Sequence, residues 1–185
     1  MLRVARPITL CASALMATQA FGANLVLNPN FDTDVSDWTN QGLGTFTFSG
    51  SDGSPSPGSA RLVAQDATTP AAAASDCILI DAEPHIDFSA LVKGNAGSGL
   101  LIANAFSDTN CTNSLNDGPL FGVDTSHIGT WVALSANDQT LPSGTKSVHI
   151  IIYADVNPGG APSDISVDTV YFGPDVVFAN GFETN

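Results

Sequence analysis

The chain has 185 residues, 43% of them apolar, and a formal net charge of −13 from 5 basic and 18 acidic residues. This apolar content is enough for the packed core of one domain. An acidic surface repels phosphate backbones and anionic membranes, so we expect no nucleic-acid binding. The 17 glycines and 11 prolines are too many chain-breaking residues for a helical bundle.

Residues 1–23 have the pattern of a signal peptide. Two arginines precede an apolar stretch over residues 8–17, and small residues follow with the spacing of a signal-peptidase site. The apolar stretch is too short to span a bilayer, and no other stretch reaches that length. We therefore predict a secreted protein without a membrane span, extracellular or periplasmic. An amphipathic first helix is the alternative.

Short strands separated by turn-rich segments are expected along the rest of the chain. In residues 86–93 and 147–153, apolar side chains alternate with others, as in a strand with one buried face. The best helix candidate, residues 71–74, is too short to persist without tertiary support. The predicted strands are 25–27, 45–49, 60–65, 77–81, 86–93, 100–106, 131–136, 147–154 and 166–172.

Many short strands in one chain indicate an all-β fold. We predict an antiparallel jelly-roll β-sandwich of about 8–10 strands over residues 24–174. Residues 94–99 (GNAGSG) lie between two predicted strands and are interpreted as a hairpin turn rather than a dinucleotide-binding loop.

Two cysteines remain once the signal peptide, which holds Cys11, is removed. An even pair in an oxidising compartment most simply forms one disulfide, so we predict a Cys77–Cys111 bridge. Two unpaired thiols are the alternative.

Catalytic motifs are lacking in the sequence. It contains no G-x-S-x-G, H-E-x-x-H or Walker A pattern, and its three histidines have no metal-ligand spacing. We therefore do not expect an enzyme. A small hydrolase using two unmarked aspartates stays open, because a fold can join distant carboxylates.

The first residues after the signal peptide carry the most specific pattern. Residues 24–32 read NLVLNPNFD, and Trp38 follows six residues later. This resembles the opening of CenC-type carbohydrate-binding modules, which have a galactose-binding-like jelly roll. Three later segments resemble family strands in the same order: residues 57–62 (PGSARL), 88–94 (FSALVKG) and 166–172 (SVDTVYF).

The resemblance implies a structural calcium ion near the meeting of the first and last strands. It assigns this ion to Asp32, where the family usually has Glu, and to Asp168. Carboxylate and carbonyl oxygens are the ligands that calcium prefers, and carbonyls of residues 51–59 are candidates to complete the shell. The large apolar side chains Phe31 and Trp38 are expected to close one end of the sandwich.

The resemblance also implies glycan binding on a sheet face or at loop tips. Where the family often has an outward Trp, this chain has Leu91, which removes a common stacking platform. The remaining candidates are polar or aromatic residues on strands expected to line one sheet: Asn104, Phe106, His149 and Tyr153. Packing in the core or at an edge is the alternative role for Phe106 and Tyr153, and Lys93 is available to pair with an acidic neighbour.

The tail, residues 175–185, resembles a short Phe-x-x-Gly-Phe-Glu ending found on some exported proteins of Gram-negative bacteria. Cell-surface attachment through the tail and a terminal strand that packs Phe178 and Phe182 are both open. The sequence thus predicts a secreted, non-catalytic module that binds a polysaccharide or other glycan reversibly. A structural or adhesive surface protein that has lost sugar binding is the alternative.

Overall fold

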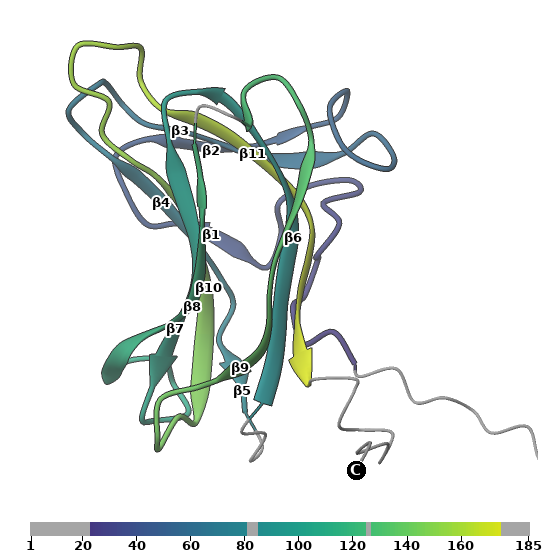
Figure 1. Ribbon diagram of the computed structural model, residues 1–185, viewed down its shortest axis with the longest axis vertical. Helices are drawn as coiled ribbons and strands as arrows, with labels where there is room; N and C mark the ends of the chain where they lie inside the picture. Colours follow the sequence, from purple (N-terminus) through teal and green to yellow (C-terminus); the bar gives the residue numbers. More distant parts are fainter. Residues whose placement is uncertain (1–22, 81–84, 125–126, 175–185) are drawn as a thin grey trace, which may run out of the picture.

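The computed structural model describes residues 23–80, 85–124 and 127–174, which form two antiparallel β-sheets packed face to face (Figure 1). The predicted sandwich is therefore confirmed. The tail and, apart from Ala23, the predicted signal peptide lie outside the described residues. The described residues contain no helix with the length and apolar character that a membrane span requires.

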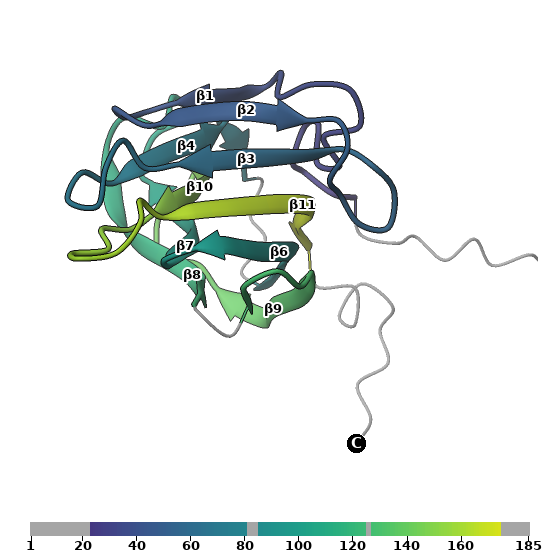
Figure 2. The same cartoon turned by 90° about the horizontal axis from the view of Figure 1, so that it is seen from above.

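Sheet A has the strand order β1-β4-β10-β7-β8, with β5 paired to β10, and sheet B has the order β2-β3-β11-β6-β9. Figure 2 shows the two sheets side by side, with the strands of each following one another in this order. The strands of sheet A are β1 (Trp38–Asn40), β4 (Ala71–Ser75), β5 (Ile78–Leu79), β7 (Gly99–Phe106), β8 (Ser114–Val123) and β10 (Ser147–Ala154). Those of sheet B are β2 (Thr45–Ser49), β3 (Ser59–Val63), β6 (His85–Ala96), β9 (Val132–Thr140) and β11 (Asp164–Pro174).

The core lies between the sheets and is built from alternating side chains. In β6 every second residue from Ile86 to Val92 is buried, and in β10 Val148, Ile150 and Ile152 are at most 1% exposed. Both alternations were predicted from the sequence. Phe88 and Phe172 meet edge to face across neighbouring strands, with ring centroids 6.1 Å apart.

The structure differs from several local expectations. Residues 71–74, which were judged too short to persist as a helix and were not predicted as a strand, form β4, because β1 and β10 pair with its two edges. The turn at residues 94–99 is no hairpin, since β6 belongs to sheet B and β7 to sheet A. Strands β1 and β8 were not predicted. Residues 25–27 form no regular strand, although the amide of Leu25 donates to the carbonyl of Phe172.

The opening segment and the last strand lie side by side, as expected. Val170 donates its amide to the carbonyl of Pro29, and the Asn24 side chain bonds the backbone of Val170 and Phe172. Phe31 and Trp38 are 0% and 6% exposed, with ring centroids 5.3 Å apart. The two rings are therefore packed together and buried where the opening segment of the chain enters the sandwich.

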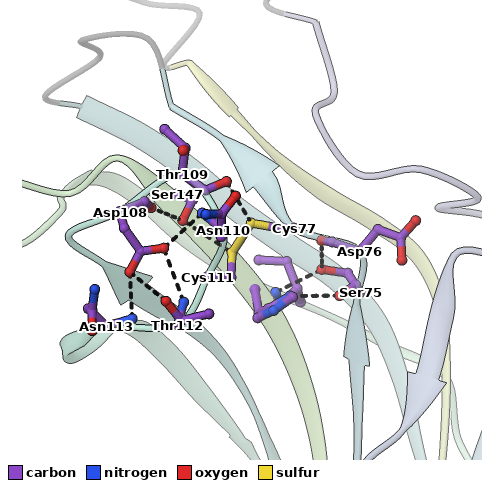
Figure 3. Close-up of a disulfide and its surroundings, with 12 residues drawn as sticks. Ser75, Asp76, Cys77, Asp108, Thr109, Asn110, Cys111, Thr112, Asn113 and Ser147 are labelled. Carbon is purple, nitrogen blue, oxygen red and sulfur yellow. Dashed lines mark hydrogen bonds between the residues drawn. A yellow bond between two sulfur atoms is a disulfide. The ribbon is translucent and has the colours of Figure 1, made fainter.

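The predicted disulfide is present. Cys77 and Cys111 are bonded, with Cα atoms 5.9 Å apart, and the bridge joins the segment after β4 to the loop between β7 and β8 (Figure 3). It closes a sequence separation of 34 residues. The bridge therefore ties together two parts of sheet A that are distant along the chain.

We expect the double variant C77A/C111A to unfold at a lower denaturant concentration than the wild type. The loop-closure model gives a loss of about 3–4 kcal/mol for a loop of this size. Urea unfolding of both proteins, with and without reductant, measures the difference. Reductant is expected to lower only the wild-type midpoint, and equal midpoints for the oxidised wild type and the variant would contradict the expected stabilisation.

Candidate functional site

The outer side of β7 and β10 brings together the four residues predicted to bind ligand. In the β7–β10 ladder, Asn104 lies opposite His149, and Leu100 lies opposite Tyr153. Between these two pairs, Ile102 lies opposite Ile151. We call this surface the sheet A face; its residues are Leu100, Ile102, Asn104, Phe106, His149, Ile151 and Tyr153.

The sheet A face changes in character along the strands. The Asn104–His149 pair is polar, the next pair is aliphatic, and the last pair carries the Tyr153 ring. His149 and Tyr153 are four residues apart on one strand, which corresponds to about 13 Å. Figure 1 shows the loops after β3 and β10 leaning away from sheet B at one end of this face, and the start of strand β8 leaning away from it at the other end.

Phe106 is mainly a packing residue. Its side chain is only 7% exposed, and its ring meets His149 edge to face with the centroids 5.4 Å apart. The packing alternative therefore describes Phe106 better than direct ligand contact does. Tyr153 is half-buried, and its hydroxyl forms no hydrogen bond with any residue that the structure describes.

The Asn104 and His149 side chains are each held by one hydrogen bond. Nδ1 of His149 lies 2.7 Å from the carbonyl oxygen of Ser75, and the Ser114 hydroxyl donates to Oδ1 of Asn104 at 3.2 Å. These contacts fix both side chains on the sheet A face while leaving each with a second polar atom.

A hydrogen-bonded loop lies beside the disulfide at one end of the face (Figure 3). The Asp108 carboxylate accepts bonds from the backbone amides of Asn110, Thr112 and Asn113, and the Ser147 hydroxyl donates to the Asp108 carbonyl. Desolvation opposes the charge of Asp108, but these amide bonds together outweigh it and lower its pKa to about 2. The loop is thus ordered by a carboxylate that prefers to stay ionised.

Comparison with known proteins identifies the fold. No family model and no curated protein match the sequence. The structure is similar to that of the enzymatically active domain of bacteriophage CBA120 tailspike protein 4, with a TM-score of 0.60 and 18% identity, over 81% of this chain and 21% of that chain. The chain therefore spans about a fifth of that tailspike domain.

Two binding modules are matched over nearly their whole length. The CBM22-1 xylan-binding domain from Paenibacillus barcinonensis Xyn10C has a TM-score of 0.58 and 14% identity, over 82% of this chain and 94% of that chain. A family 61 carbohydrate-binding module in complex with β-1,4-galactotriose has a TM-score of 0.53 and 12% identity, over 83% and 99%. The protein has the jelly-roll fold of carbohydrate-binding modules.

A second candidate site surrounds Asp168, on the outer side of sheet B. Asp168 is 2% exposed and accepts hydrogen bonds from the amides of Ser54 at 2.8 Å and Thr169 at 2.7 Å. Burial raises the pKa of Asp168, and the negative charge of nearby Asp32 raises it further. The two carboxylates assigned to calcium are thus near enough for their charges to interact. We call Asp32, Ser54, Gly58, Ser59 and Asp168 the Asp168 cluster.

The backbone around the Asp168 cluster is unusual. Phe31 and Thr169 have positive φ angles of 47° and 49°, which β-branched Thr rarely adopts. A Cβ on Gly58 would lie 2.7 Å from the carbonyl oxygen of Phe31, so only glycine fits there. These constraints bring the carbonyls of residues 31 and 32 against the loop that contacts Asp168.

The donor set of the cluster suits a hard cation. Ser59 precedes Ala60, which pairs with Val167 directly before Asp168, and the buried Oγ of Ser59 has no hydrogen-bond partner among the described residues. No group of three or more His, Cys, Asp or Glu side chains occurs in the described ranges. An ion here would therefore be held by two carboxylates together with hydroxyl and carbonyl oxygens, which are calcium ligands.

Sequence reasoning missed the role of Trp131. Lys93 forms an ion pair with Asp52 and lies 5.2 Å from the centre of the Trp131 ring, and the indole nitrogen of Trp131 donates to Asp52 at 3.3 Å. Lys93 thus pairs with an acid, one of the roles considered for it. Strand alternation placed Lys93 outward, but no local pattern indicates which loop covers it.

Leu91 lies on a different sheet from the candidate ligand residues. It is opposite Asp168 in the β6–β11 ladder of sheet B, whereas the sheet A face is formed by β7 and β10. The absence of an aromatic side chain at position 91 therefore affects the outer side of sheet B and not the sheet A face.

We expect D108N to destabilise the protein at pH 7 and to lose this effect in acid. Because the folded pKa is lowered, the ionised Asp108 contributes stability above its ordinary value of 3.8, and that contribution is lost as the pH falls through about 2. Urea midpoints measured from pH 7 to 2 should therefore converge. D76N, which removes an acid beside the same disulfide, is the control. A decrease in the urea midpoint of D108N that is independent of pH would overturn this account.

Proposed function

We propose that the protein is a non-catalytic module that binds a neutral glycan reversibly on the sheet A face. The observation that carries this is the sheet A face: half-buried Asn104, His149 and Tyr153 keep polar atoms that bond no described residue, beside half-buried Leu100 and Ile151, whereas Ile102 is only 8% exposed. Sugars combine apolar C–H surfaces with hydroxyl groups, so a site that binds them needs both kinds of contact. Similar modules bind xylan and β-1,4-galactotriose, which supports this ligand class.

Charge favours a neutral glycan. The chain carries a formal net charge of −13, and the residues of the sheet A face include no lysine or arginine. A polysaccharide rich in carboxylates would be repelled and would find no cationic partner on this face. The small apolar area implies modest affinity.

The CenC-type assignment is part of this proposal. It rests on the four sequence segments that resemble family motifs in order, and on the jelly roll that such modules share. We also propose that residues 1–23 direct export, that residues 24–174 are the folded domain, and that the tail attaches the protein to the cell surface. A disulfide fits an oxidising compartment outside the cytoplasm.

A specific observation favours the alternative, a structural or adhesive protein without sugar binding. Trp38 is buried, and Trp131 contacts residues of sheet B, so neither tryptophan belongs to the sheet A face. Phe106 is also largely buried. The face therefore relies on Tyr153 for ring contact with a sugar.

We expect Y153A to weaken glycan binding about three- to tenfold, in line with the ~0.5–1.5 kcal/mol of a ring contact. Calorimetry with xylohexaose and β-1,4-galactotriose, preceded by a glycan array, measures the change. W131F changes an aromatic residue of sheet B and should bind like the wild type. An array without binding would favour the structural alternative, and release of reducing sugar would contradict the non-catalytic role.

We also propose that the Asp168 cluster binds a structural calcium ion. Asp168 is buried beside a second carboxylate, and the charged groups that its oxygens contact include no described lysine or arginine. A divalent cation held by Asp32 and Asp168 would offset both charges. Calcium binding needs ionised carboxylates, so its affinity is expected to fall as acid protonates Asp168, whose pKa is raised.

We expect millimolar calcium to raise the melting temperature of chelator-treated protein, because an ion that binds only the native state stabilises it. D168N should abolish this shift and should not lower the melting temperature without calcium, since it removes an uncompensated buried charge. D34N, in the same loop as Asp32, should retain the shift. Differential scanning calorimetry provides the measurement, and an unchanged wild-type melting temperature would refute the calcium site.

A further inference from the structure

Asn104 and His149 are neighbours whose hydrogen bonds leave complementary atoms unused. They are directly opposite in the β7–β10 ladder, so their side chains stand together on the sheet A face. Each is held by one hydrogen bond, to Ser114 and to Ser75 respectively. The Phe106 ring also meets the imidazole edge to face, with an angle of 88° between the rings.

The contact with Ser75 decides which nitrogen of His149 carries the hydrogen. A carbonyl oxygen only accepts hydrogen bonds, so at 2.7 Å from it Nδ1 must be the donor. In the neutral imidazole the other nitrogen, Nε2, then holds a lone pair and accepts. In Asn104, Oδ1 already accepts from Ser114, which leaves the two hydrogens of Nδ2 to donate.

Both unused atoms are open to solvent. Neither Nε2 of His149 nor Nδ2 of Asn104 bonds to a residue that the structure describes. In the described ranges, the buried side-chain nitrogen or oxygen without a partner is Ser59 Oγ. Water therefore reaches the pair in the free protein, and a ligand of the right chemistry can replace that water.

We infer that Asn104 and His149 select two neighbouring free hydroxyl groups of a sugar ring. Nδ2 of Asn104 donates to the oxygen of one hydroxyl, and the other hydroxyl donates to Nε2 of His149. This inference rests on the proposed glycan binding and narrows its ligand class. Methylation of the hydroxyl that donates to His149 removes its hydrogen and leaves Nε2 unpaired, and such mismatches are discriminated strongly.

The first test uses the free protein and is independent of any glycan. Long-range ¹H–¹⁵N NMR of the histidine rings at pH 8 reports which nitrogen is protonated. The expected result is hydrogen on Nδ1 of His149. Hydrogen on Nε2 would overturn the inference, because the ring would then have no acceptor to offer a sugar hydroxyl.

The second test measures xylohexaose and β-1,4-galactotriose binding by calorimetry. H149Q places an acceptor oxygen near the position of Nε2 and should bind within about twofold of the wild type, whereas H149F should bind about three- to tenfold more weakly. N104A should show a similar loss, and O-methylated xylohexaose should bind both the wild type and N104A weakly. Circular dichroism of each variant confirms folding.

The outcomes separate this inference from the proposed function. If the wild type binds a glycan and Y153A weakens it, but H149F and N104A bind normally, the hydroxyl selection is wrong and the glycan site stands. If the wild type binds no glycan on the array, the proposed function falls and the inference falls with it.

Discussion

One extra residue in β11 determines how the last strand serves both the core and the Asp168 cluster. The register of β11 against β6 shifts between Asp168 and Tyr171, where Thr169 has a left-handed φ of 49°. This bulge resets the alternation, so Ile165 and Val167 before it and Val170 and Phe172 after it all face the core. It also leaves Asp168 outward, under the loop that carries Ser54, and lets Val170 bond Pro29 of the opening segment. Without the bulge, Asp168, Val170 and Phe172 would all point to the same side of sheet B. Either the carboxylate would then enter the core or the two apolar side chains would face outward.

The outer faces of the two sheets differ because their polar groups are satisfied differently. On sheet B, Arg61 makes two bonds to Asp164, Asn95 bonds the same carboxylate, and Lys93 pairs with Asp52. The basic residues Arg61 and Lys93 on that surface are therefore already paired with acids. On sheet A, Asn104 and His149 each use one polar atom in a hydrogen bond and leave a second atom to water, which the hydroxyl groups of a ligand would replace in the proposed function.

Much of the fold and part of the candidate site could be predicted from the sequence. The remainder could not, for physical reasons. Period-two alternation identified β6 and β10 because one side of each faces the core. The same alternation grouped Asn104 with His149, since β7 and β10 are both regular. The alanines of β4 carry no such contrast, and their strand is set by pairing with β1 and β10. The sheet to which Leu91 belongs, and the loop that covers Lys93, depend on long-range connections that no local pattern encodes.

In the proposed glycan site, the disulfide would act through rigidity rather than through contact with the ligand. A face with a small apolar area gains little from burial, so any ordering of side chains or loops on binding would consume most of the favourable free energy. Here the bridge between Cys77 and Cys111 and the amide bonds to Asp108 order the loop next to Phe106 before any ligand arrives. Phe106 in turn packs against His149, whose proton is fixed by the Ser75 carbonyl. In the proposed glycan site, the chain of contacts from the disulfide to Nε2 would present one acceptor in one orientation, and this preorganisation would compensate for the limited area of the face.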